Sequence, residues 1–203
     1  SDPLIIEEYP EISPDEKYVM YEIQIPHPEY GEYAYDSDIY MVPFNNGLGG
    51  EAKKLEGASE EGVREYFARF SRDGKWVVFN RIEGYGDVFL ENTDLYIVPA
   101  QGGTPRKLAS NSDEMDSAVI WSSNSRWITF VSRRYYINES RLFISEIDEN
   151  GNAYPAIKLP NTEQETGVGF QHPYYTNDKR ALVKILKNFE KFITELSDLC
   201  PPE

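Results

Sequence analysis

The sequence of 203 residues has a single cysteine, Cys200, and no long apolar run. One cysteine excludes an intrachain disulfide and a thiolate metal cluster. No stretch approaches the roughly 20 apolar residues that a transmembrane helix needs, so we expect no membrane insertion. The first residues do not have the pattern of a signal peptide, so we expect that any targeting sequence has been removed or that none existed.

Basic residues are also scarce, with 20 lysines and arginines against 35 aspartates and glutamates, and the formal net charge is −15. A field of this sign repels phosphate backbones and anionic lipids. We therefore expect no nucleic acid and no membrane surface among the partners. An acidic surface of this kind keeps a protein soluble.

Catalytic motifs are missing as well. The two histidines, His27 and His172, each precede a proline and are far apart in the sequence, so they do not form a multi-histidine metal site. The chain has no Gly-x-Ser-x-Gly nucleophile elbow, no covalent haem motif and no glycine-rich phosphate loop. We predict no cofactor, no catalytic residue and no enzymatic activity for this chain by itself.

Calcium is the one metal for which the sequence offers oxygen ligands. Asp36 with Asp38, or Asp87 with Glu91, could supply carboxylates. EF-hand spacing is absent, and exposed acidic residues in loops are usually solvated. We therefore predict no metal site.

An internal repeat is present, and it decides the fold class. Residues 70–80 contain a polar turn followed by a dense apolar run, and residues 12–21, 121–130 and, more weakly, 175–183 repeat this pattern. The aligned hydroxyl residues Ser13, Ser71, Ser122 and Thr176 lie 58, 51 and 54 residues apart. The repeat predicts one structural unit that is used several times.

A second pattern recurs in phase with the first. Segments 38–43, 94–99 and 141–146 are each followed by a turn signal and then by a short stretch that ends in leucine, at 53–55, 106–108 and 157–159. Each unit therefore reads as four short strands, which we call A to D. Strand A ends at the aligned serine, and strand B is the apolar run.

The apolar runs at 76–79 and 127–130 are too apolar for a sheet with one wet face, and they predict strands buried between neighbouring sheets. Four-stranded antiparallel units repeated at about 50 residues are typical of a β-propeller. We predict an all-β fold with three complete blades and a fourth that begins. The predicted blade boundaries are about 9–57, 66–109 and 118–160, with the fourth blade begun at 168.

These motifs resemble the TolB-like (WD40-like) β-propeller repeat family over roughly residues 9–185. The middle unit, 68–108, matches the family pattern nearly throughout. The first unit departs from it at Glu16, where the family has glycine, and the third has Asn124 and Ser125 in place of Asp-Gly. The resemblance implies a scaffold that works in bacterial envelope complexes, and therefore a periplasmic or secreted protein.

The C-terminal part reads differently from the repeat. Apolar residues between 182 and 199 fall at helical spacing, so we expect a propeller part over 1–177 and an amphipathic helix with a tail over 178–203. Residues 178–186 also fit a strand of a fourth unit.

Propellers usually close with 4 to 8 blades. A partial ring has open ends, which a protein partner, additional blades or a second copy of the chain would cover. A self-sufficient stack capped by its own helix is the alternative.

Alternation of the strands places the B–C loops and the D–A linkers on one side of the blades. These B–C loops are rich in tyrosine, and loops on a rigid scaffold often carry binding sites. The predicted binding residues are Tyr30, Tyr33, Tyr35, Asp36, Tyr85, Asp87, Arg133, Arg134, Tyr135 and Tyr136. The tyrosines could instead simply cover a hydrophobic rim.

Three functions are compatible with the sequence. The first is a non-catalytic protein-interaction or scaffold module, which is a subunit or fragment of a larger complex. The second is the non-catalytic propeller portion of a larger enzyme, such as a prolyl-oligopeptidase-type peptidase or a multidomain redox protein. The third is binding of a glycan or another small ligand through the aromatic loops.

Overall fold

In the part of the chain that the structure describes, thirteen segments of regular structure make up three antiparallel units, which we call blades 1, 2 and 3. The computed structural model describes residues 5–27, 35–83, 93–135 and 140–160. Blade 1 comprises β1 (Ile6–Ile12), β2 (Tyr18–Pro26), β3 (Tyr35–Pro43), a 3-10 turn η2 (Asn45–Gly47) and β4 (Lys53–Lys54). Blade 2 comprises β5 (Val63–Phe70), β6 (Trp76–Glu83), β7 (Asp94–Pro99) and β8 (Arg106–Lys107). Blade 3 comprises β9 (Asp116–Trp121), β10 (Trp127–Ser132), β11 (Arg141–Glu146) and β12 (Ile157–Lys158).

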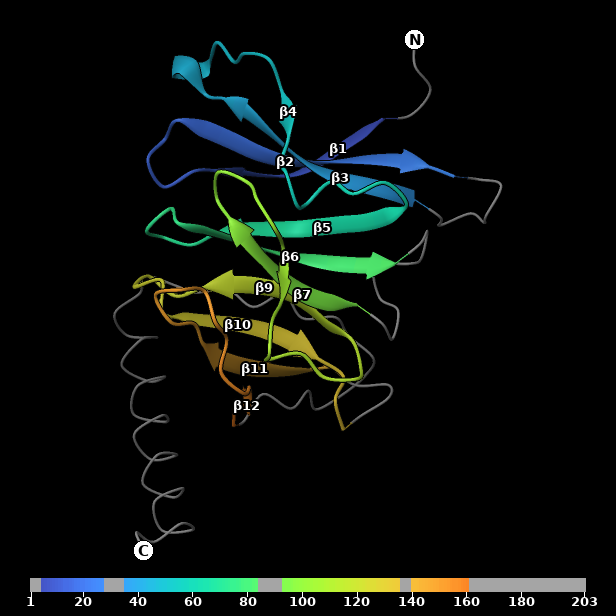
Figure 1. Cartoon of the computed structure of the whole chain (residues 1–203), viewed down its shortest axis with the longest axis vertical. Helices are drawn as coiled ribbons and strands as arrows, with labels where there is room; N and C mark the ends of the chain where they lie inside the picture. Colours follow the sequence, from blue (N-terminus) through green and yellow to red (C-terminus); the bar gives the residue numbers. More distant parts are fainter. Residues whose placement is uncertain (1–4, 28–34, 84–92, 136–139, 161–203) are drawn as a thin grey trace, which may run out of the picture.

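Each blade is a meander in which strands A to D pair in chain order. A single parallel bridge between Ser37 and Arg64 links the sheet of blade 1 to that of blade 2. Figure 1 shows the blades stacked face to face in chain order. The all-β propeller-type fold with four-stranded blades is therefore confirmed. The predicted fourth unit from 168 and the predicted helix over 178–203 lie outside the described residues.

The three A–B turns are built with one set of hydrogen bonds. In blade 2 the hydroxyl of Ser71 donates to Asp73 Oδ1 at 2.7 Å and accepts from the amide of Trp76 at 3.0 Å. The same two bonds form at Ser13 in blade 1 and at Ser122 in blade 3. One residue in each turn has a left-handed backbone: Glu16 (φ 58°), Gly74 (φ 71°) and Ser125 (φ 58°). The departures seen at the glycine position therefore leave the turn geometry unchanged.

Strand β6 shows how the blades hold together. Val77 and Phe79 point toward blade 1 and join a cluster with Met20 and Ile39, while Val78 points the other way into a cluster with residues of blade 3. All three β6 side chains are fully buried. The prediction of a strand buried on both faces between neighbouring sheets is thus correct, because alternate side chains serve two different interfaces.

Each blade consequently has two distinct apolar faces. The presenting face lies toward the next blade, and the receiving face lies toward the preceding one. The presenting faces contain Met20, Ile39 and Met41 in blade 1 and Val78, Leu95 and Ile97 in blade 2. The receiving faces contain Phe70, Val77, Phe79, Tyr96 and Val98 in blade 2 and Trp121, Ile128, Phe130 and Phe143 in blade 3.

A cross-strand aromatic pair lies in the centre of every receiving face. The ring centroids are 6.1 Å apart for Phe79 and Tyr96 in blade 2, and 6.3 Å apart for Phe130 and Phe143 in blade 3. Such pairs add to the burial energy of the two rings and fix the register of strands B and C. The blades are therefore equivalent in packing as well as in hydrogen bonding.

Candidate interaction surfaces

The loop side of the blades contains five of the ten predicted binding residues in its described part, namely Tyr35, Asp36, Arg133, Arg134 and Tyr135. The other five, Tyr30, Tyr33, Tyr85, Asp87 and Tyr136, lie outside the described residues. Arg134 contacts the linker between β8 and β9, which places a B–C loop beside a D–A linker as the alternation of strands requires. Binding by these residues stays a prediction.

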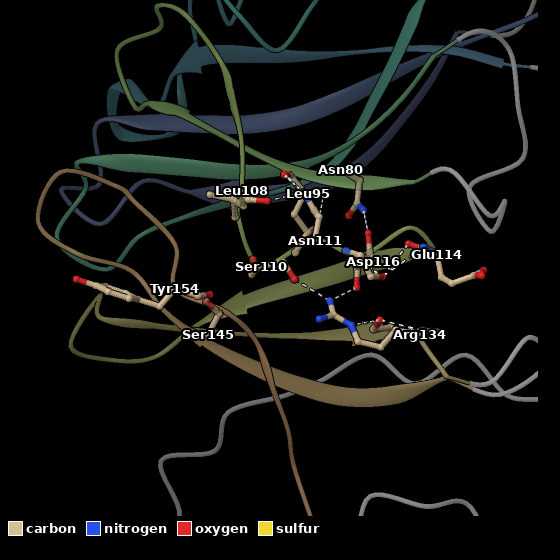
Figure 2. A network of polar contacts seen from close by, with 12 residues as sticks. Asn80, Leu95, Leu108, Ser110, Asn111, Glu114, Asp116, Arg134, Ser145 and Tyr154 are labelled. Atoms are coloured by element: carbon tan, nitrogen blue, oxygen red, sulfur yellow. Dashed lines mark hydrogen bonds and ion pairs between the residues drawn. The ribbon is translucent and has the colours of Figure 1, made fainter. Parts of the chain in front are cut away.

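Arg134 fixes the B–C loop of blade 3 to the start of β9. Its Nη2 atom lies 2.7 Å from Asp116 Oδ1 and 2.7 Å from the carbonyl oxygen of Ser110, as Figure 2 shows. Its guanidinium carbon lies 4.5 Å from the centroid of the Phe143 ring. Asp116 also accepts a hydrogen bond from the amide of Ser112 at 2.6 Å. Because an arginine and a carboxylate buried together must satisfy each other, the Arg134 side chain has an internal role.

The neighbouring Tyr135 has a different environment. It is 80% exposed, and its backbone is left-handed with φ of 76°. The strained backbone turns the side chain outward, beside the ring of Phe143 at a centroid distance of 6.3 Å. Of the described residues in the B–C loop of blade 3, Tyr135 offers the largest accessible aromatic surface.

Arg64 lies on this loop side of the blades as well, at the interface of blades 1 and 2. The guanidinium carbon of Arg64 lies 5.3 Å from the centroid of the Tyr35 ring and 5.4 Å from that of Tyr66. Because of this contact, the Tyr35 ring is partly used for packing against the arginine. The next residue, Asp36, has a carboxyl pKa that is raised by burial and, to a smaller extent, by repulsion from Asp38.

A buried glutamate joins strand B of blade 1 to strand A of blade 2. Glu22 accepts a hydrogen bond from Gln24 Nε2 at 2.7 Å and one from the backbone amide of Phe67 at 3.3 Å. Gln24 Nε2 also donates to Glu8 Oε2 at 3.2 Å. Burial raises the pKa of Glu22 to about 7, although these hydrogen bonds oppose the shift. Sequence reasoning missed this group, because a lone acidic residue within an alternating strand gives no signal.

The amide that Glu22 binds belongs to a β-bulge found in every strand A. Tyr9, Phe67 and Ala118 each have φ near +53° and each lie four residues before the aligned serine. At the next interface Asn80 replaces the glutamate: its Oδ1 accepts from the amide of Ala118 at 3.3 Å, and its Nδ2 donates to the carbonyl of Asp116 at 3.0 Å. A polar side chain from strand B therefore holds the bulge of the following blade.

A second buried carboxyl group lies at the start of β5. Glu65 is fully buried, accepts a hydrogen bond from the amide of Glu60 at 3.3 Å, and has Arg81 Nη1 at 3.7 Å. Burial raises the pKa of Glu65 to about 8, and Arg81 only partly opposes this effect. Glu65 occupies the repeat position of Asp116, six residues before the aligned serine. Both groups anchor a D–A linker to strand A.

The receiving face of blade 1 is an apolar surface that the described residues leave partly uncovered. Ile12 is 52% exposed, whereas its repeat equivalents Phe70 and Trp121 are 3% and 2% exposed. The aromatic pair of this face, Tyr21 and Tyr40, has a centroid distance of 6.0 Å, which matches the other two blades. Both rings are only half-buried, and among the described residues no blade packs on this face. The face has the structure of a blade interface without its partner.

No helix in the described part of the chain is long and apolar enough to span a bilayer. Among the same residues, no group of three or more histidine, cysteine, aspartate or glutamate side chains is arranged to hold a metal ion.

Comparisons with protein-family models and with curated proteins give no match. Solved structures do match. An acylaminoacyl peptidase of Pyrococcus horikoshii aligns with 78% of this chain and 26% of its own length, at 15% identity and a TM-score of 0.53. The β-propeller domain of the Trilobed protease from Pyrococcus furiosus aligns over 77% of this chain and 43% of its own, at 14% identity and a TM-score of 0.51.

A putative TolB from Agrobacterium tumefaciens aligns over 78% of this chain and 50% of its own, at 18% identity and a TM-score of 0.52. This chain thus spans between a quarter and a half of these proteins. Identities this low establish the fold and nothing further. Together with the repeated turns, bulges and aromatic pairs, these matches show that the described residues form consecutive blades of a β-propeller fold, similar to that of the putative TolB.

Proposed function

We propose that this chain is a non-catalytic protein-interaction module, and that the receiving face of blade 1 is its binding surface. The supporting observation is the contrast within the repeat. Side chains that blades 2 and 3 bury against a preceding blade are more exposed in blade 1: Ile12 is exposed where Phe70 and Trp121 are buried, and Tyr21 and Tyr40 are only half-buried. Apolar surface of this kind associates with a complementary surface.

The occupant that fits this face is another four-stranded blade. The receiving faces of blades 2 and 3 each pack against aliphatic side chains from strands B and C of the preceding blade, such as Met20 and Ile39. A blade that presents the same side chains would complete the interface of blade 1. Its source would be a longer form of the same protein or a partner subunit, since the chain spans at most half the length of its structural neighbours. The TolB-like fold supports a setting in the bacterial envelope or outside the cell.

Thiol labelling tests this proposal. In a background with Cys200→Ser, Ile12→Cys places one thiol on the receiving face, and Leu48→Cys places one on a turn residue that is 84% exposed. In the isolated chain both thiols should react at similar rates. In the natural gene product and its native assembly, Ile12→Cys should react at least about tenfold more slowly than Leu48→Cys, because a docked blade excludes the reagent. Equal rates in the native assembly would contradict the proposal.

Sedimentation of the isolated chain identifies the source of the blade. A second copy in this role gives a concentration-dependent association, which Tyr21→Lys on the receiving face should abolish and Tyr21→Phe should preserve. A monomer at all concentrations assigns the blade to a longer protein or to a different subunit.

A second function is supported by a specific observation, namely the match to acylaminoacyl peptidase structures over only about a quarter of their length. The chain would then be part of the non-catalytic propeller of a larger peptidase. A fluorophosphonate probe for reactive serines applied to the natural gene product tests this idea. Labelling of a product larger than 203 residues supports it, and absence of labelling on the intact product contradicts it.

A further inference from the structure

A groove lies between blades 1 and 2 on the side of the A–B and C–D turns, away from the receiving face of blade 1. It has a volume of about 750 Å³. Its apolar lining comes from both blades: Tyr18, Met41, Pro43, Leu55, Phe70 and Ala100. Its charged rim includes Asp15, Lys53, Arg72 and Asp73. We propose that this groove binds an extended peptide segment that combines a glycine-containing polar turn with small apolar residues.

The corresponding place between blades 2 and 3 is partly occupied by a turn of the chain itself. The C–D turn of blade 3, residues 147–156, is four residues longer than that of blade 2, residues 100–105. Within this longer turn, Ala153 and Ala156 pack against the cluster between blades 2 and 3. The longer turn therefore fills part of the groove between blades 2 and 3, where a cavity of about 410 Å³ remains, whereas the shorter turn of blade 2 leaves about 750 Å³ open between blades 1 and 2.

Two side chains of blade 2 hold the longer turn in place. Arg106 Nη2 donates to the carbonyl oxygen of Asn150 at 2.7 Å, and its Nη1 donates to Asn152 Oδ1 at 2.8 Å. The guanidinium carbon of Arg106 lies 5.5 Å from the ring centroid of Trp76. Gly151 lies so close to this tryptophan that a Cβ atom there would come within 3.0 Å of the ring. The Trp76 ring and the Arg106 guanidinium thus form the binding site for this turn, which we call the turn-binding pair.

Blade 1 has an aromatic ring and a cation at the positions that correspond to the turn-binding pair, namely Tyr18 and Lys53. Lys53 pairs with Met41 as Arg106 pairs with Ile97, and Tyr18 lies five residues after Ser13 as Trp76 lies five residues after Ser71. The shorter turn of blade 2 leaves the residue at the base of the groove, Met41, less covered than its equivalent in blade 2. Ile97 is fully buried, whereas Met41 remains half-exposed.

The ligand chemistry follows from these contacts. Lys53 is exposed and can donate to a peptide carbonyl, as Arg106 does in the occupied interface. The ring of Tyr18 can lie against a glycine, as Trp76 does. Small apolar side chains such as alanine can pack on Met41, while larger ones would compete with Phe70 and Leu55 for space. We assign the peptide to a partner protein, because the longer turn among the described residues, 147–156, already packs between blades 2 and 3.

The probe for the test is a synthetic peptide with the sequence of residues 150–157, which contains the Asn-Gly-Asn turn and both alanines. The chain has only three methionines, so selective 13C labelling of their methyl groups gives three reporters. Met41 lines the groove, Met20 lies beneath it in the cluster between blades 1 and 2, and Met115 lies in a different cluster near blade 3. Addition of the peptide should shift the Met41 signal strongly and leave the Met115 signal unchanged.

Matched variants complete the test. Lys53→Ala should weaken binding about fivefold to tenfold, because it removes a charged hydrogen-bond donor. Leu48→Ala, on an exposed turn outside the groove, should leave the affinity unchanged. A peptide with aspartate in place of both alanines should not bind. The proposal is overturned by the absence of a Met41 shift at millimolar peptide, by equal shifts of Met41 and Met115, or by equal binding of the aspartate peptide.

Discussion

Glu16 occupies the left-handed position of the A–B turn in blade 1, where blade 2 has Gly74. A residue with a Cβ atom in this conformation costs roughly 1–2 kcal/mol, and glycine in its place costs about 0.5–1 kcal/mol of additional chain entropy on folding. Glu16→Gly should therefore raise the free energy of unfolding by about 0.5–1 kcal/mol. For a chain of this size, that corresponds to an increase in Tm of about 1–4 °C.

The equivalent serine in blade 3 separates backbone strain from hydrogen bonding. Ser125 has the same φ of 58° as Glu16, but its hydroxyl accepts a hydrogen bond from the amide of Asp73 at 2.8 Å. Ser125→Gly relieves the strain and loses this bond between two blades, which contributes about 1 kcal/mol. The two effects are similar in size, so we expect almost no net change in stability. Gly74→Ala should be destabilising by about 1 kcal/mol.

Urea unfolding followed by tryptophan fluorescence measures all three variants in one assay. The expected order of stability is Glu16→Gly above wild type, Ser125→Gly close to wild type, and Gly74→Ala below it. A Glu16→Gly variant that is less stable than wild type would refute the reasoning, because the strain at this turn would then not be the dominant contribution.

Three further predictions follow from the buried groups and close contacts. Burial raises the pKa of Glu22 to about 7 and that of Glu65 to about 8, so the folded protein retains protons that the unfolded chain releases near pH 4.3. The free energy of unfolding should therefore fall as the pH rises from about 5 to about 8. Denaturant titrations at several pH values should show a smaller fall in the Glu22→Gln variant. An unchanged pH dependence in this variant would argue against a proton on Glu22. Gly151→Ala should lower the free energy of unfolding by about 2 kcal/mol or more, since its φ is +76° and the new Cβ would meet the Trp76 ring at 3.0 Å. The control Gly47→Ala, with φ of +83° and no atom within 4 Å, should lower it by only about 1 kcal/mol. Thermal melting compares the two variants, and equal losses would mean that the ring moves aside. Asn80→Ala should lower the free energy of unfolding in urea by about 3 kcal/mol, because it leaves two buried backbone groups of the next blade without their hydrogen bonds. A loss below about 1 kcal/mol would show that the bulge is held in another way.

The repeat was predictable from sequence because its hydrogen bonds use short-range residues. Ser71 and Asp73 lie two positions apart, so the turn signature is contiguous in the chain and survives as Ser122 and Asn124 in blade 3. The two-sided burial of β6 was also predictable, because an uninterrupted apolar run within a repeat of short strands favours a strand between two sheets.

The contacts between blades were not predictable in the same way. The β-bulge residues are Tyr9, Phe67 and Ala118, which share no side-chain chemistry although all three have a left-handed backbone. Their partners Glu22 and Asn80 lie 45 and 38 residues away and also differ in type. The groove between blades 1 and 2 depends on the relative lengths of two turns, which gain their meaning only when the blades are stacked.

The presenting and receiving faces also give the stack a direction. Each interface joins unlike surfaces, as Met20 against Val77 and Val78 against Ile128 illustrate. Two copies of this chain could not use this mode of packing about a twofold axis that brought their Tyr21–Tyr40 pairs together, because both would then offer the same kind of surface. Growth by blade addition is instead head-to-tail, as in a polar filament: a ring that closes gives a finite particle, and one that fails to close gives a fibre.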